Sequence, residues 1–240
     1  MSFVINRFSR SASAITMLIL FGSLCVSASA LAQEGAQASE PDLARGEELF
    51  TLCTQCHGPA GAGDQDALAP AIAGLPVWYL EAQLAKFKSG QRGLHAMDKG
   101  GLRMYPMSLW LREEGDIQAV SAYVASLPKP EITRTLTELG DAAKGLGLYA
   151  VCSACHSPDG SGNQGMGAPP LTGMNDWYLL SSIQKYKQSV RGSLPGDTLG
   201  PAMIGMVATL PDDAAVLDVI AHIQTLDEQK QAKASAEKQE

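Results

Sequence analysis

Residues 52–63 read LCTQCHGPAGAG, and residues 151–162 read VCSACHSPDGSG. Each stretch holds two cysteines three positions apart, a histidine directly after the second cysteine, and then several glycines. One offset of 99 positions (152 − 53) pairs Cys53 with Cys152, Cys56 with Cys155 and His57 with His156. The two stretches are therefore copies of one motif, and they decide how the rest of the chain is interpreted.

The copying extends well beyond this motif. At the same offset, WYL at 78–80 aligns with WYL at 177–179, and identical pairs continue as far as Leu111 and Leu210. A period this long indicates a duplicated domain and not a solenoid repeat. We expect a first domain over 33–128, a linker over 129–139 that begins among prolines, and a second domain over 140–227. A polar tail over 228–240 is expected to be a frayed helix end or unstructured chain.

The apolar pattern inside each copy is helical. Residues 41–53 and 140–152 begin with an N-cap signal and carry apolar residues at i, i+3 and i+4. A second helix is expected over 77–90 and 176–189, and a closing helix over 113–127 and 211–226. Since no stretch alternates with a period of two, the predicted fold class is all-α, with two tandem helical bundles.

The first 32 residues have the order of a secretory signal peptide. Arg7 and Arg10 precede an apolar run over 15–26, and an A-x-A cleavage site ends at Ala32. The apolar run is too short to span a bilayer. We expect cleavage after Ala32 and a periplasmic protein; the alternatives are an uncleaved membrane anchor and a lipid anchor on Cys25.

Four chemistries use paired cysteines, and the sequence separates them. A zinc site needs four ligands, but each copy offers two thiols and one nearby histidine. A thioredoxin-type pair lies beside a βαβ pattern, which is absent, and a disulfide does not require the recurring histidine. Covalent haem attachment uses every residue, because the thiols add to the porphyrin vinyl groups and the histidine binds iron. We therefore predict two haem c groups, on Cys53 and Cys56 with His57, and on Cys152 and Cys155 with His156.

A duplicated site needs a duplicated sixth iron ligand. The other histidines after residue 32, His95 and His222, do not recur at the offset, and neither do Met97, Met166 and Met174. The methionine pairs that do recur are Met104 with Met203 and Met107 with Met206. Both pairs are expected in a loop before the closing helix. One pair is expected to bind iron and the other to pack on the haem edge.

Other recurring residues allow two interpretations each. Pro70 stands 13 positions after its histidine (70 − 57), and its carbonyl either accepts the imidazole Nδ1–H or belongs to an ordinary loop; Pro169 repeats this spacing. Arg92 and Arg191 either pair with haem propionates or lie with neighbouring lysines on a solvated helix face. His222 is expected to be a surface or half-buried histidine without a clear role.

The sequence resembles a class I cytochrome c written twice, and more narrowly the diheme cytochrome c4 family. The resemblance covers about 42–226 and rests on the two C-x-x-C-H motifs, the loops APAIAG and APPLTG, and the methionine segments. In that family the iron-binding methionine stands seven positions before a leucine that opens the closing helix. The spacing to Leu111 and Leu210 then implies Met104 and Met203 as ligands (111 − 104; 210 − 203). The family also implies two haem domains that face each other and shuttle electrons in the periplasm.

The expected function is electron transfer without catalysis, because His–Met ligation leaves neither iron an open position for a substrate. We expect a periplasmic carrier between respiratory redox partners, for example from a quinol-oxidising complex to a terminal oxidase or reductase. The alternatives are a dedicated haem subunit of a dehydrogenase or oxidase complex, and a diheme oxidoreductase enzyme.

The charge of the chain narrows the choice of partner. Loss of Arg7 and Arg10 would leave 16 Lys and Arg (18 − 2) against 25 Asp and Glu. An exported protein this acidic is not a nucleic-acid binder. Its partners are expected to be redox proteins with basic docking patches, and no small-molecule substrate is expected.

Overall fold

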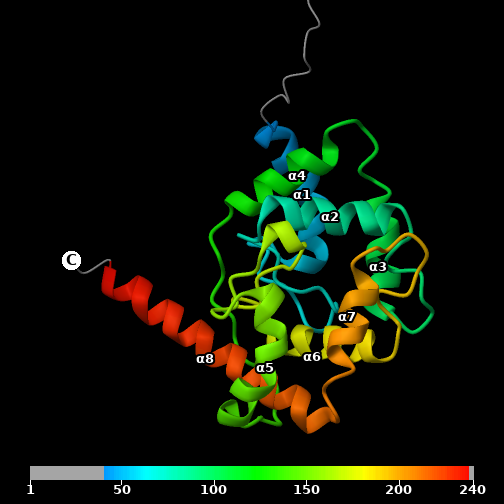
Figure 1. Ribbon diagram of the computed structural model, residues 1–240. Coiled ribbons are helices and arrows are strands. Elements are labelled where there is room, and N and C mark those ends of the chain that lie inside the picture. Colours follow the sequence, from blue (N-terminus) through cyan, green and yellow to red (C-terminus); the bar gives the residue numbers. More distant parts are fainter. Residues whose placement is uncertain (1–40, 238–240) are drawn as a thin grey trace, which may run out of the picture. The chain divides into compact units, whose positions relative to one another are not determined.

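The computed structural model describes residues 41–237, so the predicted signal peptide and the start of the predicted first domain lie outside the described residues. Within this range the chain forms helices and no strand (Figure 1). The first copy holds α1 (Leu43–His57), α2 (Val77–Lys88), α3 (Lys99–Ser108) and α4 (Asp116–Ser126). The second copy holds α5 (Ala142–His156), the 3₁₀ helix η1 (Gln164–Met166), α6 (Asp176–Lys187), α7 (Gly200–Val207) and α8 (Asp213–Glu237).

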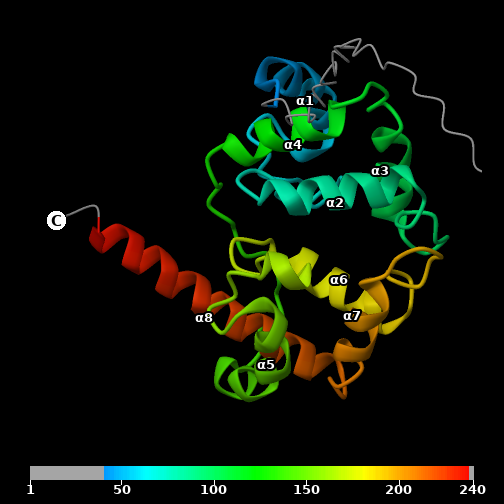
Figure 2. The same ribbon diagram turned by 45° about the horizontal axis from the view of Figure 1, so that its top comes forward.

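The two copies repeat one pattern of helix packing. In the first copy α1 packs against α4, while α2 contacts α3 and α4. In the second copy α5 packs against α8, while α6 contacts α7 and α8. Figures 1 and 2 both show α1 beside α4 and α5 beside α8. For the described residues, the all-α prediction is confirmed.

A glycine on the first helix of each copy permits this close packing. A Cβ atom at Gly46 would collide with the carbonyl oxygen of Ala119 on α4. A Cβ atom at Gly145 would collide with the carbonyl oxygen of Asp218 on α8. Only glycine allows two helix backbones to approach this closely, so both positions fix the packing of a helix pair.

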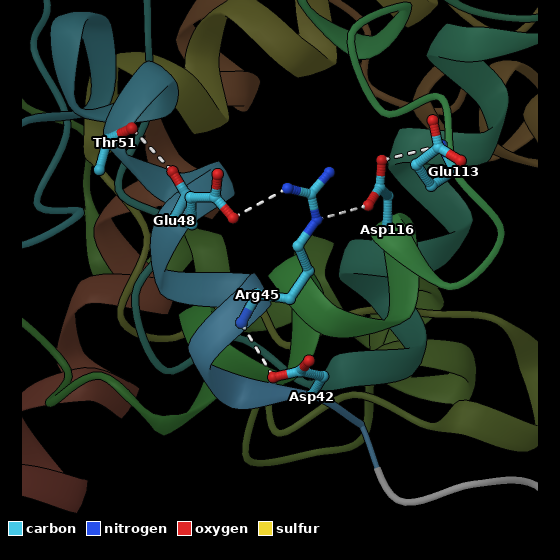
Figure 3. Close-up of polar contacts among 6 residues, drawn as sticks. All are labelled: Asp42, Arg45, Glu48, Thr51, Glu113 and Asp116. Carbon is cyan, nitrogen blue, oxygen red and sulfur yellow. Dashed lines mark hydrogen bonds and ion pairs between the residues drawn. The ribbon is translucent and has the colours of Figure 1, made fainter.

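Arg45 ties α1 to α4 through two carboxylates (Figure 3). Its Nε donates to Oδ1 of Asp116 at 3.0 Å, and its Nη1 donates to Oε2 of Glu48 at 2.9 Å. The backbone N–H of Arg45 donates to Asp42, the predicted N-cap of α1. Asp116 also accepts the N–H of Glu113, so the start of α4 is anchored from both sides.

The closing helix of the second copy continues into the polar tail. Helix α8 runs to Glu237, so residues 228–237 are helical. Lys230 donates to Thr172 at 3.1 Å and lies 3.3 Å from a carboxylate oxygen of Asp159. These contacts hold the first turn of the polar stretch against the second copy. None of the helices between residues 41 and 237 is long and apolar enough to cross a membrane.

Candidate haem-binding sites

The attachment motif of the first copy closes helix α1. Cys53 and Cys56 lie near its C-terminal end, and His57 is its last residue. Residues three and four positions apart share one face of a helix, so Cys53, Cys56 and His57 point to the same side. The chain then turns back through Gly61 and Gly63, whose φ angles of 65° and 87° only glycine adopts without strain.

This turn brings a proline carbonyl to the ring of each motif histidine. Nδ1 of His57 lies 2.7 Å from the carbonyl oxygen of Pro70, and Nδ1 of His156 lies 2.7 Å from that of Pro169. A carbonyl only accepts, so Nδ1 carries the proton and the lone pair of Nε2 is free for a metal. Burial lowers the pKa of both histidines, against the opposing effect of these hydrogen bonds. The proposed role of the two prolines as acceptors is confirmed.

The second motif leaves a nitrogen that needs a partner. Cys152 and Cys155 lie on α5, and His156 is the last residue of that helix. Nε2 of His156 is buried, and nothing in the described part of the chain forms a hydrogen bond with it. A buried polar atom left unpaired costs about 1–3 kcal/mol. A haem iron would supply the partner that this atom lacks, so His156 fits the role of a haem ligand.

A cavity of about 650 Å³ lies beside the first motif. This volume falls within the roughly 300–1,000 Å³ that cofactor sites occupy. The predicted site residues that line it are Cys53, Cys56, His57, Pro70, Met104 and Met107. Met174, Trp177 and Tyr178 of the second copy also line it. The fold thus gathers the attachment cysteines, the histidine and both candidate methionines around one space that suits a haem.

The candidate methionines lie on short helices, so the expectation of a loop is wrong. Met104 and Met107 lie on α3, and Met203 and Met206 lie on α7. An aspartate before each helix satisfies a free N–H of the first turn. Asp98 accepts from the N–H of Gly101 at 2.9 Å, and Asp197 accepts from that of Gly200 at 2.9 Å.

Recurring lysines hold the far end of each methionine helix. Nζ of Lys88 donates to the carbonyl oxygen of Leu111, three residues after the end of α3 (111 − 108). Nζ of Lys187 donates to the carbonyl oxygen of Leu210, after α7, at 2.9 Å. Each lysine thus anchors the segment that follows the methionine helix to the second helix of its own copy.

The other recurring lysines reach across to the opposite copy. Nζ of Lys86 on α2 lies 2.7 Å from Oδ1 of Asp197, and Nζ of Lys185 on α6 lies 2.8 Å from Oδ1 of Asp98. Both the lysines and the aspartates are equivalent at the 99-residue offset, so the exchange is reciprocal. The recurrence of these four residues in the sequence marks them as equivalent, but it does not show that they meet.

Arg92 and Arg191 meet where the two copies touch. Arg92 donates to Gln83 at 2.6 Å and to the hydroxyl of Tyr178 at 3.0 Å. Arg191 donates to the same two side chains at 3.3 and 3.4 Å. No carboxylate between residues 41 and 237 forms an ion pair with either arginine. Arg191 is buried and Arg92 is half-buried with a buried Nε, so the solvated-face interpretation of these two cations is wrong. Two guanidinium groups without a counter-anion among the described residues fit the negative propionates of a haem.

His222 is buried, contrary to the expectation of a surface or half-buried position. Its ring lies 5.1 Å from that of Tyr149, between centroids. The equivalent pair in the first copy is Tyr123 and Phe50, whose centroids lie 5.6 Å apart. In both copies a ring on the closing helix thus packs against a ring on the first helix, and in the second copy His222 takes this role in the core.

A family model described as cytochrome c matches the chain twice, over residues 43–128 and 142–227. The chain belongs to the cytochrome c family. Each match contains one C-x-x-C-H motif, so the cytochrome carries two covalent haem c groups, as predicted.

Known relatives indicate which kind of cytochrome c this chain resembles. The thiosulfate dehydrogenase electron acceptor of Stutzerimonas stutzeri (strain A1501) is 29% identical over 177 residues, which is 65% of this chain and 77% of the relative. The crystal structure of cytochrome c4 from Pseudomonas stutzeri has a TM-score of 0.60 and 26% identity, covering 77% of this chain and 98% of that one. A thiosulfate dehydrogenase from Marichromatium purpuratum has a TM-score of 0.61 and 30% identity, but the match covers 76% of this chain and only 40% of that one.

Several further relatives carry the name cytochrome c4. The resemblance to the diheme cytochrome c4 family is confirmed, and so is the prediction of two tandem cytochrome c domains. The cytochrome is a diheme electron-transfer protein and not an enzyme.

Proposed function

We propose that the cytochrome carries electrons in the periplasm between respiratory partners, for example from a quinol-oxidising complex to a terminal oxidase or reductase. The observation that carries this proposal is the equivalence of the two sites. Each has an attachment motif, a histidine held 2.7 Å from a proline carbonyl, and methionines on a short helix. Turnover of a substrate would require an open position on at least one iron, and the two equivalent donor sets, each with a histidine and methionines, would leave neither iron open.

Each iron would take one histidine and one methionine, His57 with Met104 and His156 with Met203. In the second copy, 41% of Met206 is exposed, whereas Met203 is partly buried, which favours Met203 as the ligand. In the first copy both methionines line the cavity, and the spacing to Leu111 favours Met104. Haem supplies a reversible one-electron couple, while the chain orients the ligands and excludes water.

The location and the domain limits belong to the same proposal. Residues 1–32 act as the signal peptide, with cleavage after Ala32, and the haem domains span 33–128 and 140–227. Export to the periplasm is consistent with the predicted cleavage site and with an acidic mature chain. The acidic charge favours partners that present basic docking patches.

A dedicated role beside a dehydrogenase is the second candidate. It is favoured by the relative named as an electron acceptor of thiosulfate dehydrogenase and by the likeness to a thiosulfate dehydrogenase structure. Co-purification from a native periplasmic extract separates the two candidates. A free carrier is recovered alone, whereas a dedicated subunit is recovered with its dehydrogenase.

An optical potentiometric titration of the native holoprotein tests the proposal. Two haems with saturated ligation should be reduced reversibly, and the reduced protein should not bind carbon monoxide. Carbon monoxide bound to one haem of the native protein would contradict electron carriage as the function and favour the enzyme alternative.

A further inference from the structure

We propose that the mouth of the first haem cavity is a docking surface for a redox protein with an acidic contact face, and that the second copy lacks this surface. The inference rests on the proposed electron-transfer function. It adds which haem domain such a partner meets and what chemistry recognises it.

Five residues of α3 and the adjoining loops both line the cavity and are exposed, which places them at its mouth. We name this set the mouth face: Leu68, Met97, Lys99, Arg103 and Trp110. Met97 is 64% exposed and Trp110 58% exposed. A large aromatic and a methionine beside cations are typical of the centre of a protein interface.

The cations of the mouth face lack carboxylate partners within residues 41–237. Lys99 forms no ion pair, and Arg103 donates to the backbone carbonyl of Ala67 at 3.0 Å. Arg112 lies beside the mouth face, with its guanidinium 5.0 Å from the centroid of Trp110. Lys99 and Arg103 are therefore free to meet carboxylates of a partner.

Acidic residues near this surface do not cancel its charge. Glu48 also lines the cavity, but its carboxylate is bound by Arg45 at 2.9 Å (Figure 3). Asp64, Asp66, Glu113 and Glu114 are exposed on neighbouring loops, and none of them lines the cavity. Among the exposed charged residues that line the cavity, the cations Lys99 and Arg103 are therefore left without a carboxylate partner within residues 41–237, although the whole chain is acidic.

The second copy has lost the mouth face while keeping the fold. At the 99-residue offset, Met97, Lys99, Arg103, Trp110 and Arg112 are replaced by Gly196, Thr198, Ala202, Thr209 and Pro211. The residues between them that hold the helix and face the haem are unchanged: Asp98 with Asp197, Met104 with Met203 and Leu111 with Leu210. Buried Ser108 also differs from its equivalent Val207, but the loss of three cations and a tryptophan falls on exposed positions of the first copy, which points to recognition at this surface.

Charge complementarity identifies the partner that fits. Without residues 1–32 the chain carries 16 Lys and Arg (18 − 2) against 25 Asp and Glu, so it repels an acidic protein except where unpaired cations gather. An acidic partner is therefore steered to the mouth face. A basic partner, as expected from the overall charge, fits the second copy better because the equivalent positions carry no cation. The two haem domains then serve partners of opposite charge.

Stopped-flow oxidation of the reduced holoprotein tests the inference, with an acidic plant plastocyanin as the protein probe. The variant Lys99→Gln/Arg103→Gln removes two mouth cations. Its matched control, Lys129→Gln/Lys233→Gln, removes two exposed cations that do not line the cavity. At low ionic strength we expect the mouth variant to slow the reaction by about threefold or more and the control to change it little. The difference should fade at high salt.

Equal slowing in the two variants would overturn the inference, since only total charge would then matter, and so would no slowing in the mouth variant. Tris(1,10-phenanthroline)cobalt(III), a small cationic oxidant, supplies a second readout, because loss of the mouth cations should not slow its reaction. Haem content and both potentials are measured for every variant. Native protein that fails to titrate reversibly would overturn the proposed function instead, so the two failures are distinguishable.

Discussion

Lys86 and Asp197 join the two haem domains through a contact of 2.7 Å, and Lys185 and Asp98 repeat it in the opposite direction at 2.8 Å. Each aspartate also accepts a backbone N–H at the start of a methionine helix. Each copy therefore braces the helix that holds the candidate iron ligand of the other copy.

Removing one of these charges should destabilise the holoprotein. Asp197→Asn keeps an oxygen that can accept the N–H of Gly200, but it leaves Lys86, whose side chain is only 19% exposed, without its counter-charge. We expect a loss of about 1–3 kcal/mol in the free energy of unfolding, measured by urea titration. Glu114→Gln, at an exposed residue with no ion pair among those described, should change it by less than about 0.5 kcal/mol. Equal effects of the two variants would contradict the bracing role.

The same pairs should make stability depend on pH in the acid range. Burial raises the pKa of Asp98 and Asp197, but hydrogen bonds and charge from the opposite lysines outweigh it, so both values lie below the ordinary one. The native state thus holds fewer protons than the unfolded state at mildly acid pH. The stabilisation is complete above the unfolded pKa of about 3.9 and is lost as the pH falls through the lower native values.

Unfolding measured between about pH 2 and pH 7 checks this prediction against Asp98→Asn/Asp197→Asn. The double variant should be less stable near neutral pH, and its curve should converge on that of the native protein in acid. Parallel curves over the whole range would mean that these carboxyl groups keep ordinary pKa values.

Much of the site could be read from the sequence because its chemistry demands fixed spacing. Two thiols and a histidine must lie on one helix face to reach one haem, so the C-x-x-C-H motif appears intact in the chain. The proline that orients the imidazole was open to two interpretations, because a backbone carbonyl leaves no side-chain signature. Only the fold places Pro70 at 2.7 Å from His57.

Contacts between the copies could not be derived in the same way. The ion pair of Lys86 joins residues 111 positions apart, and no periodicity along one helix encodes such a partner. The helical form of the methionine segment also does not follow from the sequence. Asp98 caps α3, but composition alone does not distinguish a capping aspartate from an aspartate in a loop. The burial of His222 does not follow from the sequence, because it depends on the ring of Tyr149 on another helix.

Two glycines of helix α5 offer a matched test of close helix packing. A Cβ at Gly145 would collide with the backbone of Asp218, whereas a Cβ at Gly147 would meet nothing within 4 Å. Gly145→Ala should therefore lower the free energy of unfolding by about 2 kcal/mol or more, since packed backbone cannot move cheaply. Gly147→Ala should raise it by up to about 1 kcal/mol, as alanine favours helix. Thermal unfolding of both holoproteins gives the signs, and two losses of equal size would refute close packing at Gly145.

The identity of the methionine that binds iron is the hardest assignment in the site, because Met104 and Met107 lie on one helix and line the same cavity. A thioether bound to ferric haem gives a weak absorption band near the red end of the spectrum. Met104→Ala should remove this band from one haem, lower the potential of that haem and open its reduced iron to carbon monoxide. Met107→Ala should keep the band and cost about 2–5 kcal/mol of stability at most, through lost packing.

The second copy supplies an internal control for this test. Met206 is 41% exposed, so Met206→Ala should cost less stability than Met107→Ala, while Met203→Ala should remove the band from the other haem. If Met107→Ala removes the band while Met104→Ala retains it, the ligand lies three residues further along α3. If neither variant changes the band, the sixth ligand is not one of these methionines. The iron of the first domain would then have a different ligand from the one that the repeat implies, and the two sites would no longer be equivalent.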